Sequence, residues 1–173
     1  MKTATWSRTA LVFVLAAFAA VVWGSVVQTH YNLQALASIG VDVGDVRAGT
    51  MARDVFSGFT PTYGGYVVLP ALLVAFAIAW FIVRTRPSLR IALFVVGGYL
   101  AVLAAIPLVN YLSPVALLVG ASRDTSAIFW MAGGGALAGL VFSLLADVPG
   151  NRASARIEPV PPQATSTGPA MRG

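Results

Sequence analysis

The sequence predicts an all-α integral membrane protein with four transmembrane helices in an antiparallel bundle. Two observations predict this class: the composition, and four long apolar runs. The 173 residues are 58% hydrophobic and only 10% charged, whereas soluble domains are about 45–50% apolar and about 25% charged. A chain with so few charges cannot cover a water-facing surface, so we expect lipid to cover part of it.

The four apolar runs are each long enough to cross a bilayer. A helix needs about 20 predominantly apolar residues to cross a hydrocarbon core of about 30 Å, and the backbone there must be helical because lipid offers no hydrogen-bond partner. The runs are continuous rather than alternating, which excludes a β-barrel. Uncharged stretches of 18, 20, 22 and 20 residues occupy 10–27, 64–83, 91–112 and 127–146. We therefore expect a transmembrane domain over 1–148, with spans at about 9–28, 64–83, 91–112 and 126–146.

The first run has a second interpretation. Lys2 and Arg8 could form the basic region of a signal peptide that is cleaved after Gly24. The apolar stretch is longer than the core of a usual signal peptide, about 7–15 residues, which favours a retained span. Neither interpretation changes the order of the other three spans.

The distribution of Lys and Arg predicts the orientation. The segment 84–90 contains three arginines and no acidic residue, and loops of this kind are cytoplasmic under the positive-inside rule. Both termini are then cytoplasmic, with eight basic residues inside and three outside. The inner residues are Lys2, Arg8, Arg84, Arg86, Arg90, Arg152, Arg156 and Arg172, and the outer ones are Arg47, Arg53 and Arg123.

Two segments lie outside the predicted spans. In the outer segment, 29–63, we expect the first helix to continue to Gly40, a residue type suited to a helix C-terminus. A second short helix is predicted at about 46–56. The segment 149–173 is rich in Pro, Ser, Thr, Ala and Gly, a composition that cannot bury a core. We expect it to be a disordered cytoplasmic tail.

Small residues predict where the helices touch. In lipid, close packing replaces the hydrophobic drive between helices, so small side chains mark contacts. One interpretation is packing within the bundle, and the other is that the fourth span also forms a homo-oligomer contact. The predicted packing residues are Ala16, Ala20, Gly24, Gly97, Gly135 and Gly139.

Polar residues gather at the predicted outer ends of the spans, which converge in an antiparallel bundle. His30 with Asp54 or Asp124 would be the obvious general-base pair. The simpler interpretation is that these residues end the spans and bond across helices. The candidate outer polar cluster consists of Gln28, His30, Asn32, Asp54, Asn110, Arg123 and Asp124.

Several functional classes are disfavoured. No Asp, Glu, Lys or Arg side chain lies within a predicted span. This argues against a pump, a proton-coupled carrier and a voltage sensor. The chain has no cysteine and one histidine, so thiolate metal sites and bis-histidine haem ligation within one chain are excluded. The basic residues do not cluster on one face, so no nucleic acid is expected. We predict no catalytic residue, metal or cofactor.

The stretch 23–33 (WGSVVQTHYNL), with 58–61 (GFTP), resembles a pattern in small uncharacterised bacterial four-helix inner-membrane proteins. The resemblance implies a multi-pass fold and a location in the bacterial inner (plasma) membrane, and it brings no activity.

Three functional hypotheses remain open. The leading one is a non-enzymatic accessory or scaffold protein, with the lipid bilayer and either a second copy or another membrane protein as partners. The second is a transport or channel component that acts as an oligomer. The third is a membrane enzyme acting on a lipid or quinone at the outer interface, with His30, Asp54 and Arg123 involved. A lipid-sized cleft between spans one and three would favour the enzyme.

Overall fold

The computed structural model describes residues 2–40, 42, 49–50, 52–53, 62–112 and 124–146. All regular structure within these residues is helical. Four helical stretches are long and apolar enough to cross a membrane, which confirms this part of the predicted fold class. The elements in chain order are α1 (Lys2–Ser38), the π-helix η1 (Gly64–Val68), α4 (Leu69–Thr85), the 3₁₀-helix η2 (Pro87–Leu89), α5 (Arg90–Leu112) and α6 (Thr125–Leu145).

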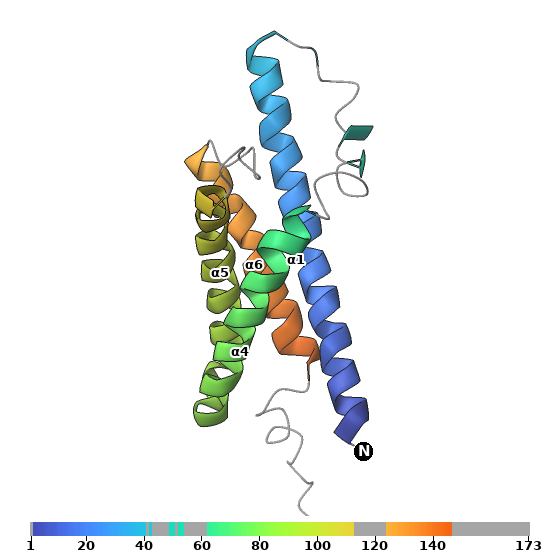
Figure 1. Cartoon of the computed structure of the whole chain (residues 1–173), viewed down its shortest axis with the longest axis vertical. Coiled ribbons are helices and arrows are strands. Elements are labelled where there is room, and N and C mark those ends of the chain that lie inside the picture. Colours follow the sequence, from blue (N-terminus) through green and yellow to red (C-terminus); the bar gives the residue numbers. More distant parts are fainter. Residues whose placement is uncertain are drawn as a thin grey trace, which may run out of the picture.

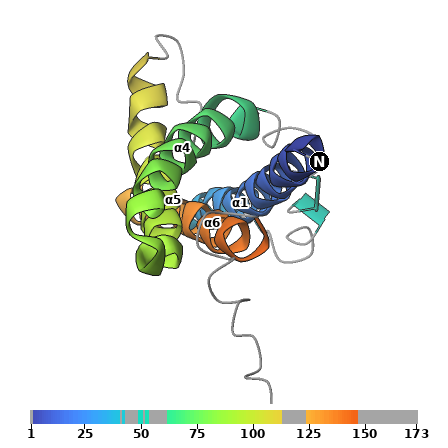
Figure 2. The same ribbon diagram turned by 90° about the horizontal axis from the view of Figure 1, so that it is seen from below.

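Helix α6 is the central element of the bundle. It packs against both α1 and α5, and it lies between them in Figures 1 and 2. Helix α4 packs against α5 and reaches α1 through η1. The N-terminus, the α4–α5 turn and the last residues of α6 lie at one end of the bundle (Figure 1), which we call the hairpin end.

Helix α1 is longer than its predicted span of 9–28. Its 37 residues extend about 55 Å at about 1.5 Å per residue, and its C-terminal part projects past the other helices (Figure 1). The helix stops before Gly40, whose φ of 86° is left-handed, and the Gly40 N–H donates to the Ala37 carbonyl at 3.1 Å. The predicted cap at Gly40 is therefore confirmed.

The other predicted extramembrane elements lie largely outside the described residues. Residues 49–50 and 52–53 are helical, and the rest of the predicted 46–56 helix is not described. The predicted tail, 149–173, is also outside the described residues.

The π-helix η1 precedes a proline. Pro70 has no N–H and cannot donate to the preceding turn. The turn before it is wider, and the Leu69 N–H donates to the Gly64 carbonyl. This segment places Tyr63 and Gly64 against α1: a Cβ on Gly64 would lie 3.1 Å from Val21 Cγ2.

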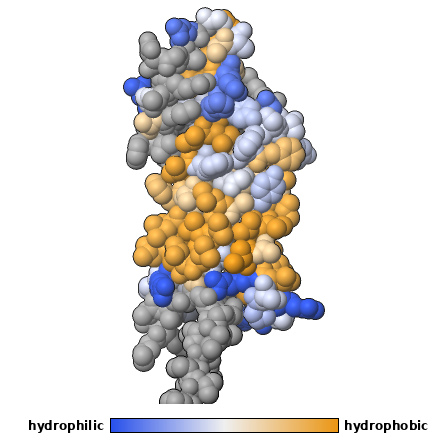
Figure 3. All heavy atoms as spheres, turned by 180° about the vertical axis from the view of Figure 1, so that it is seen from behind, coloured by the Kyte–Doolittle hydropathy of each residue, from blue (hydrophilic) through white to orange (hydrophobic). Residues whose placement is uncertain are grey.

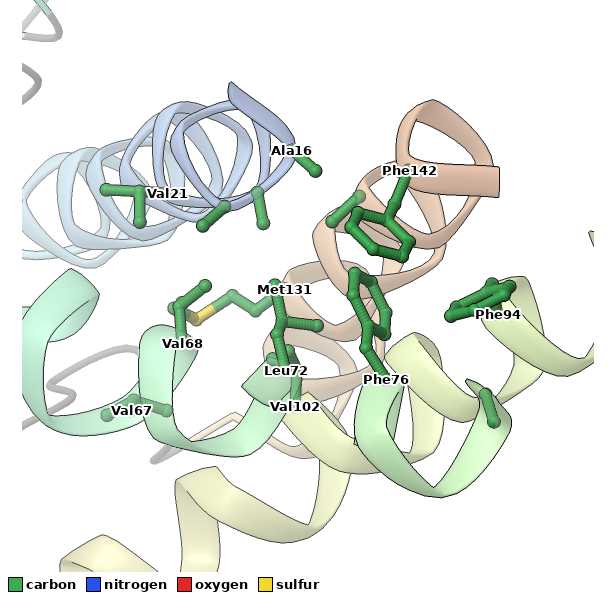
Figure 4. Packing of buried hydrophobic residues seen from close by; sticks show 14 of the residues in the cluster. Ala16, Val21, Val67, Val68, Leu72, Phe76, Phe94, Val102, Met131 and Phe142 are labelled. Carbon is green, nitrogen blue, oxygen red and sulfur yellow. The ribbon is translucent and has the colours of Figure 1, made fainter. Parts of the chain in front are cut away.

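Four phenylalanines, one from each long helix, form the core near the hairpin end. Phe142 of α6 lies 4.9 Å from Phe76 of α4, 5.1 Å from Phe94 of α5 and 6.3 Å from Phe13 of α1, measured between ring centroids. These spacings are favourable for aromatic pairs. Figure 4 shows three of these rings converging, with Met131 further along the core. The cluster ties all four helices together.

The exterior of the bundle is apolar as well. Figure 3 shows an orange band across the lower part of one face, bounded below by hydrophilic residues. Every long helix contributes large exposed apolar side chains, including Phe18, Leu73, Phe81, Leu100 and Leu144.

Candidate functional site

The closest contacts in the bundle join the backbones of α5 and α6. A Cβ on Gly98 of α5 would lie 2.9 Å from the carbonyl carbon of Gly135 and would collide with its oxygen. One turn further along α6, a Cβ on Gly139 would collide with the Phe94 carbonyl and lie 2.8 Å from Val95 Cα. Only glycine permits this approach, and small residues of this kind are typical of contacts between transmembrane helices.

A second glycine face of α6 packs against α1. A Cβ on Gly134 would lie 2.8 Å from the Ala20 carbonyl oxygen, and Ala16 and Ala20 are fully buried. The Trp23 indole N–H donates to the Trp130 carbonyl at 2.7 Å. Helix α6 thus makes close contacts with two neighbours on two faces.

Two of the predicted packing residues lie in other surroundings. Gly24 faces a side chain rather than a helix backbone, because a Cβ there would lie 2.8 Å from Tyr63 Cζ. At Gly97 a Cβ would meet no atom within 4 Å, and the contact with α6 falls on its neighbour Gly98. A shift of one residue turns a helix face by about 100°, so Gly97 lines the groove between α4 and α5 instead.

The predicted outer polar cluster is only partly brought together. Gln28 is buried on α1, Asn32 is exposed, and Asn110 is half-buried in the last turn of α5. The His30 ring is half-buried and meets Tyr31 edge to face at 5.8 Å. Asp54 and Arg123 lie outside the described residues.

Asp124 acts as the N-cap of α6. Its carboxylate accepts hydrogen bonds from the Ser126 N–H and the Ser126 hydroxyl, both at 2.8 Å, which is the usual role of aspartate at a helix start. The Tyr31 and Ser126 hydroxyls share a hydrogen bond of 2.7 Å, linking α1 to this cap.

His30 makes no hydrogen bond to any described residue, so the His30–Asp124 pair is not formed. A pair with Asp54 remains a hypothesis.

The sequence reasoning missed a group of buried polar side chains. Ser25 and Thr29 of α1 are fully buried, and the Thr29 hydroxyl donates to the Ser25 carbonyl at 2.9 Å. The Tyr63 ring covers Gly24, and burial raises the pKa of its hydroxyl above the ordinary value of 10.0, so the phenol stays neutral. The signal was the spacing of Ser25, Gln28 and Thr29, which places them on one helix face.

A groove of about 590 Å³ lies between α1 and α4 at the hairpin end. Its floor is formed by Phe13, Phe76 and Phe142, and Trp80 and Arg84 also line it. The cleft considered from the sequence was between spans one and three, whereas this groove lies between spans one and two. It also lies at the opposite end of α1 from His30, so it does not support catalysis by that residue.

A second groove, of about 700 Å³, lies between α4 and α5. Its lining is apolar and includes the small residues Gly97, Ala101 and Ala105. These residues form the face of α5 that turns away from α6.

Arg90 fixes the start of α5 to the end of α6. Its guanidinium Nη2 donates to the Ser143 carbonyl, and the Ser143 hydroxyl donates to the Leu140 carbonyl at 2.9 Å. The sequence analysis used Arg90 only to predict which side of the membrane the 84–90 segment faces. In the structure Arg90 also joins α5 to α6.

Among the described residues, no three His, Cys, Asp or Glu side chains lie close enough together to hold a metal ion. Comparisons with protein-family models, curated proteins and solved structures find no match to the chain.

Proposed function

We propose that the chain is a four-span protein of the bacterial inner (plasma) membrane that acts as a non-enzymatic accessory or scaffold. Its helices cross the bilayer as an antiparallel bundle, with both termini in the cytoplasm. The apolar exterior of the bundle (Figure 3) supports insertion, because water-soluble monomers rarely expose large contiguous apolar patches. The excess of basic residues at the hairpin end supports the orientation, and the resemblance at 23–33 supports the inner membrane.

The length of α1 carries the scaffold proposal. A helix of about 55 Å exceeds a hydrocarbon core of about 30 Å, so its C-terminal part stands clear of the bilayer on the outer side. This part exposes Leu36, and Ile39, which directly follows the helix, is 74% accessible. Apolar side chains on a rigid projecting helix form a suitable contact surface for another protein.

The outer polar residues support the same proposal. Asp124 is engaged as a helix cap and Ser126 links that cap to Tyr31. General acid–base catalysis needs a base within hydrogen-bond reach of a reacting group and a partner that orients it. His30 has the Tyr31 ring beside it, and no described carboxylate orients it.

The test is complementation of a strain that lacks the gene, with each variant matched for membrane abundance. The double variant Leu36→Asp/Ile39→Asp should lose function and should no longer co-purify with a partner protein. The reason is that it removes the apolar surface at the end of the projecting helix. Gln34→Asp adds charge to an exposed position nearby without removing an apolar side chain, so it should remain functional. Loss of function in His30→Ala at normal abundance, with the double variant active, would contradict the scaffold proposal and favour an enzyme.

A further inference from the structure

The groove between α1 and α4 has the dimensions of a lipid-chain site. The two helices diverge toward the hairpin end, with α6 visible between them (Figure 1). The α4 residues that line the groove run from Leu73 to Arg84, a rise of about 16 Å. This is about half the thickness of a hydrocarbon core of about 30 Å, the depth of one leaflet. The volume of about 590 Å³ is typical of a small-ligand site.

The chemistry of the groove changes along its length. Its deep part is a floor of phenylalanine rings, and its mouth at the hairpin end carries Trp6, Trp80 and Arg84. The indole N–H of Trp6 and that of Trp80 donate no hydrogen bond to any described residue, in contrast to Trp23. An apolar channel that ends in indole and guanidinium groups matches an amphiphile with an apolar tail and a polar head.

The charge at the mouth is positive and uncompensated within the described residues. The Arg84 guanidinium lies 5.5 Å from the centroid of the Phe81 ring and makes no ion pair with any described side chain. The segment that follows Arg84, residues 85–90, contains no acidic residue that could neutralise it. Basic pockets between helices on the cytoplasmic side favour anionic head groups.

We propose that the α1/α4 groove holds one acyl chain of an anionic phospholipid, with the lipid phosphate at the Arg84 guanidinium. The inference rests on the proposed membrane location, because the chain must sit in a bilayer to take up such a lipid. A zwitterionic lipid would bring its own cation toward Arg84, so the anionic head group is preferred. The bound lipid would fill the space that α1 and α4 leave between them.

The test is native mass spectrometry of the full-length protein in mild detergent, with phosphatidylglycerol and phosphatidylcholine of identical acyl chains as probes. The wild-type protein should retain one phosphatidylglycerol in preference to phosphatidylcholine. Arg84→Gln should weaken that retention about fivefold, the usual effect of one basic residue on an anionic lipid surface.

Arg86→Gln is the matched control. It removes the same charge from the same turn, and Arg86 does not line the groove, so lipid retention should be unchanged. Equal loss in both variants would indicate general surface attraction and overturn the site, as would wild-type retention in Arg84→Gln. Displacement of the lipid by millimolar inorganic phosphate would overturn it too, since a simple anion site would then explain the data.

A second pair of variants tests the chain-binding part of the groove. Ala77→Leu adds bulk to an exposed position in the α1/α4 groove, and Ala104→Leu adds the same bulk to the α4/α5 groove. Only Ala77→Leu should reduce the retained phosphatidylglycerol, and unchanged retention there would overturn the proposal. If the scaffold proposal fails in complementation, selective lipid retention at Arg84 can still be observed, so the two failures are distinguishable.

Discussion

At the scale of single residues, the bundle depends on close contacts between helix backbones, at positions where a larger side chain would not fit. The α5–α6 contact brings the backbones at Gly98 and Gly135 together, and the α1–α6 contact does the same at Gly134 and Ala20. A protein interior is nearly close-packed, so added atoms displace neighbours that have nowhere to move. Gly98 and its neighbour Gly97 differ in this respect and allow a direct comparison.

We expect Gly98→Ala to destabilise the protein by about 1–3 kcal/mol, the usual cost of overpacking. Its new methyl group would collide with the backbone of α6 at Gly135. Gly97→Ala should be neutral or stabilising by up to about 1 kcal/mol, because the methyl group meets open space and alanine is the better helix former. Reversible unfolding in mixed detergent micelles measures both, and equal stability of the two variants would contradict the assigned contact.

His30→Ala should change stability by no more than about 0.5 kcal/mol, as is usual for surface substitutions. The ring is half-exposed, and its contact is the edge-to-face pair with Tyr31. Unfolding of the purified variant and its abundance in membranes measure the effect. A larger loss would mean that His30 has a structural partner in the segment around Asp54.

At the scale of elements, α6 organises the bundle through both its glycines and Phe142. That ring meets one phenylalanine from each of the other three helices. Arg90 and Asp124 then fix the two ends of α6, the first through the Ser143 carbonyl and the second as its N-cap. Changes in α6 should therefore affect all four helices together.

Phe142→Ala should destabilise the protein by about 3–5 kcal/mol, the usual range for a buried phenylalanine. Phe129→Ala on the same helix should cost far less, because Phe129 is 51% exposed. Reversible unfolding, monitored by circular dichroism, distinguishes them. A cost for Phe129→Ala as large as that for Phe142→Ala would contradict the central position of the aromatic cluster.

The sequence allowed good prediction of the elements because composition and periodicity are local properties. The four apolar stretches appear as four long helices, and the predicted fourth span, beginning at 126, agrees with α6 beginning at Thr125. The first helix continues past the predicted span of 9–28, as the sequence predicted for the segment up to Gly40. Gly40 still marked the true end of that helix.

Tertiary features were less accessible to sequence reasoning. Small residues at four-residue spacing pointed to Gly97, with Ala101 and Ala105, whereas Gly98 has no such pattern. Only the rotation of α5 against α6 shows that Gly98 makes the contact. The burial of Tyr63 depends on the π turn before Pro70, which no local periodicity indicates. The α1/α4 groove arises from the divergence of two helices distant in sequence.

At the scale of the whole molecule, charge and hydropathy divide the bundle along its axis. The N-terminus, the arginine-rich turn and the end of α6 lie together (Figure 1), next to an apolar band (Figure 3). In the proposed topology of four crossings, both termini fall on the same side of the membrane, and the positive-inside rule assigns that side to the cytoplasm. The same proposal places the projecting end of α1 outside the cytoplasm.

Reporter fusions test this arrangement most directly. Alkaline phosphatase, which is active only outside the cytoplasm, should be active when fused after Gly40 and inactive when fused after Gly173. Green fluorescent protein, which folds in the cytoplasm, should fluoresce after Gly173. High phosphatase activity and no fluorescence after Gly173 would contradict the four-span topology on which the account depends.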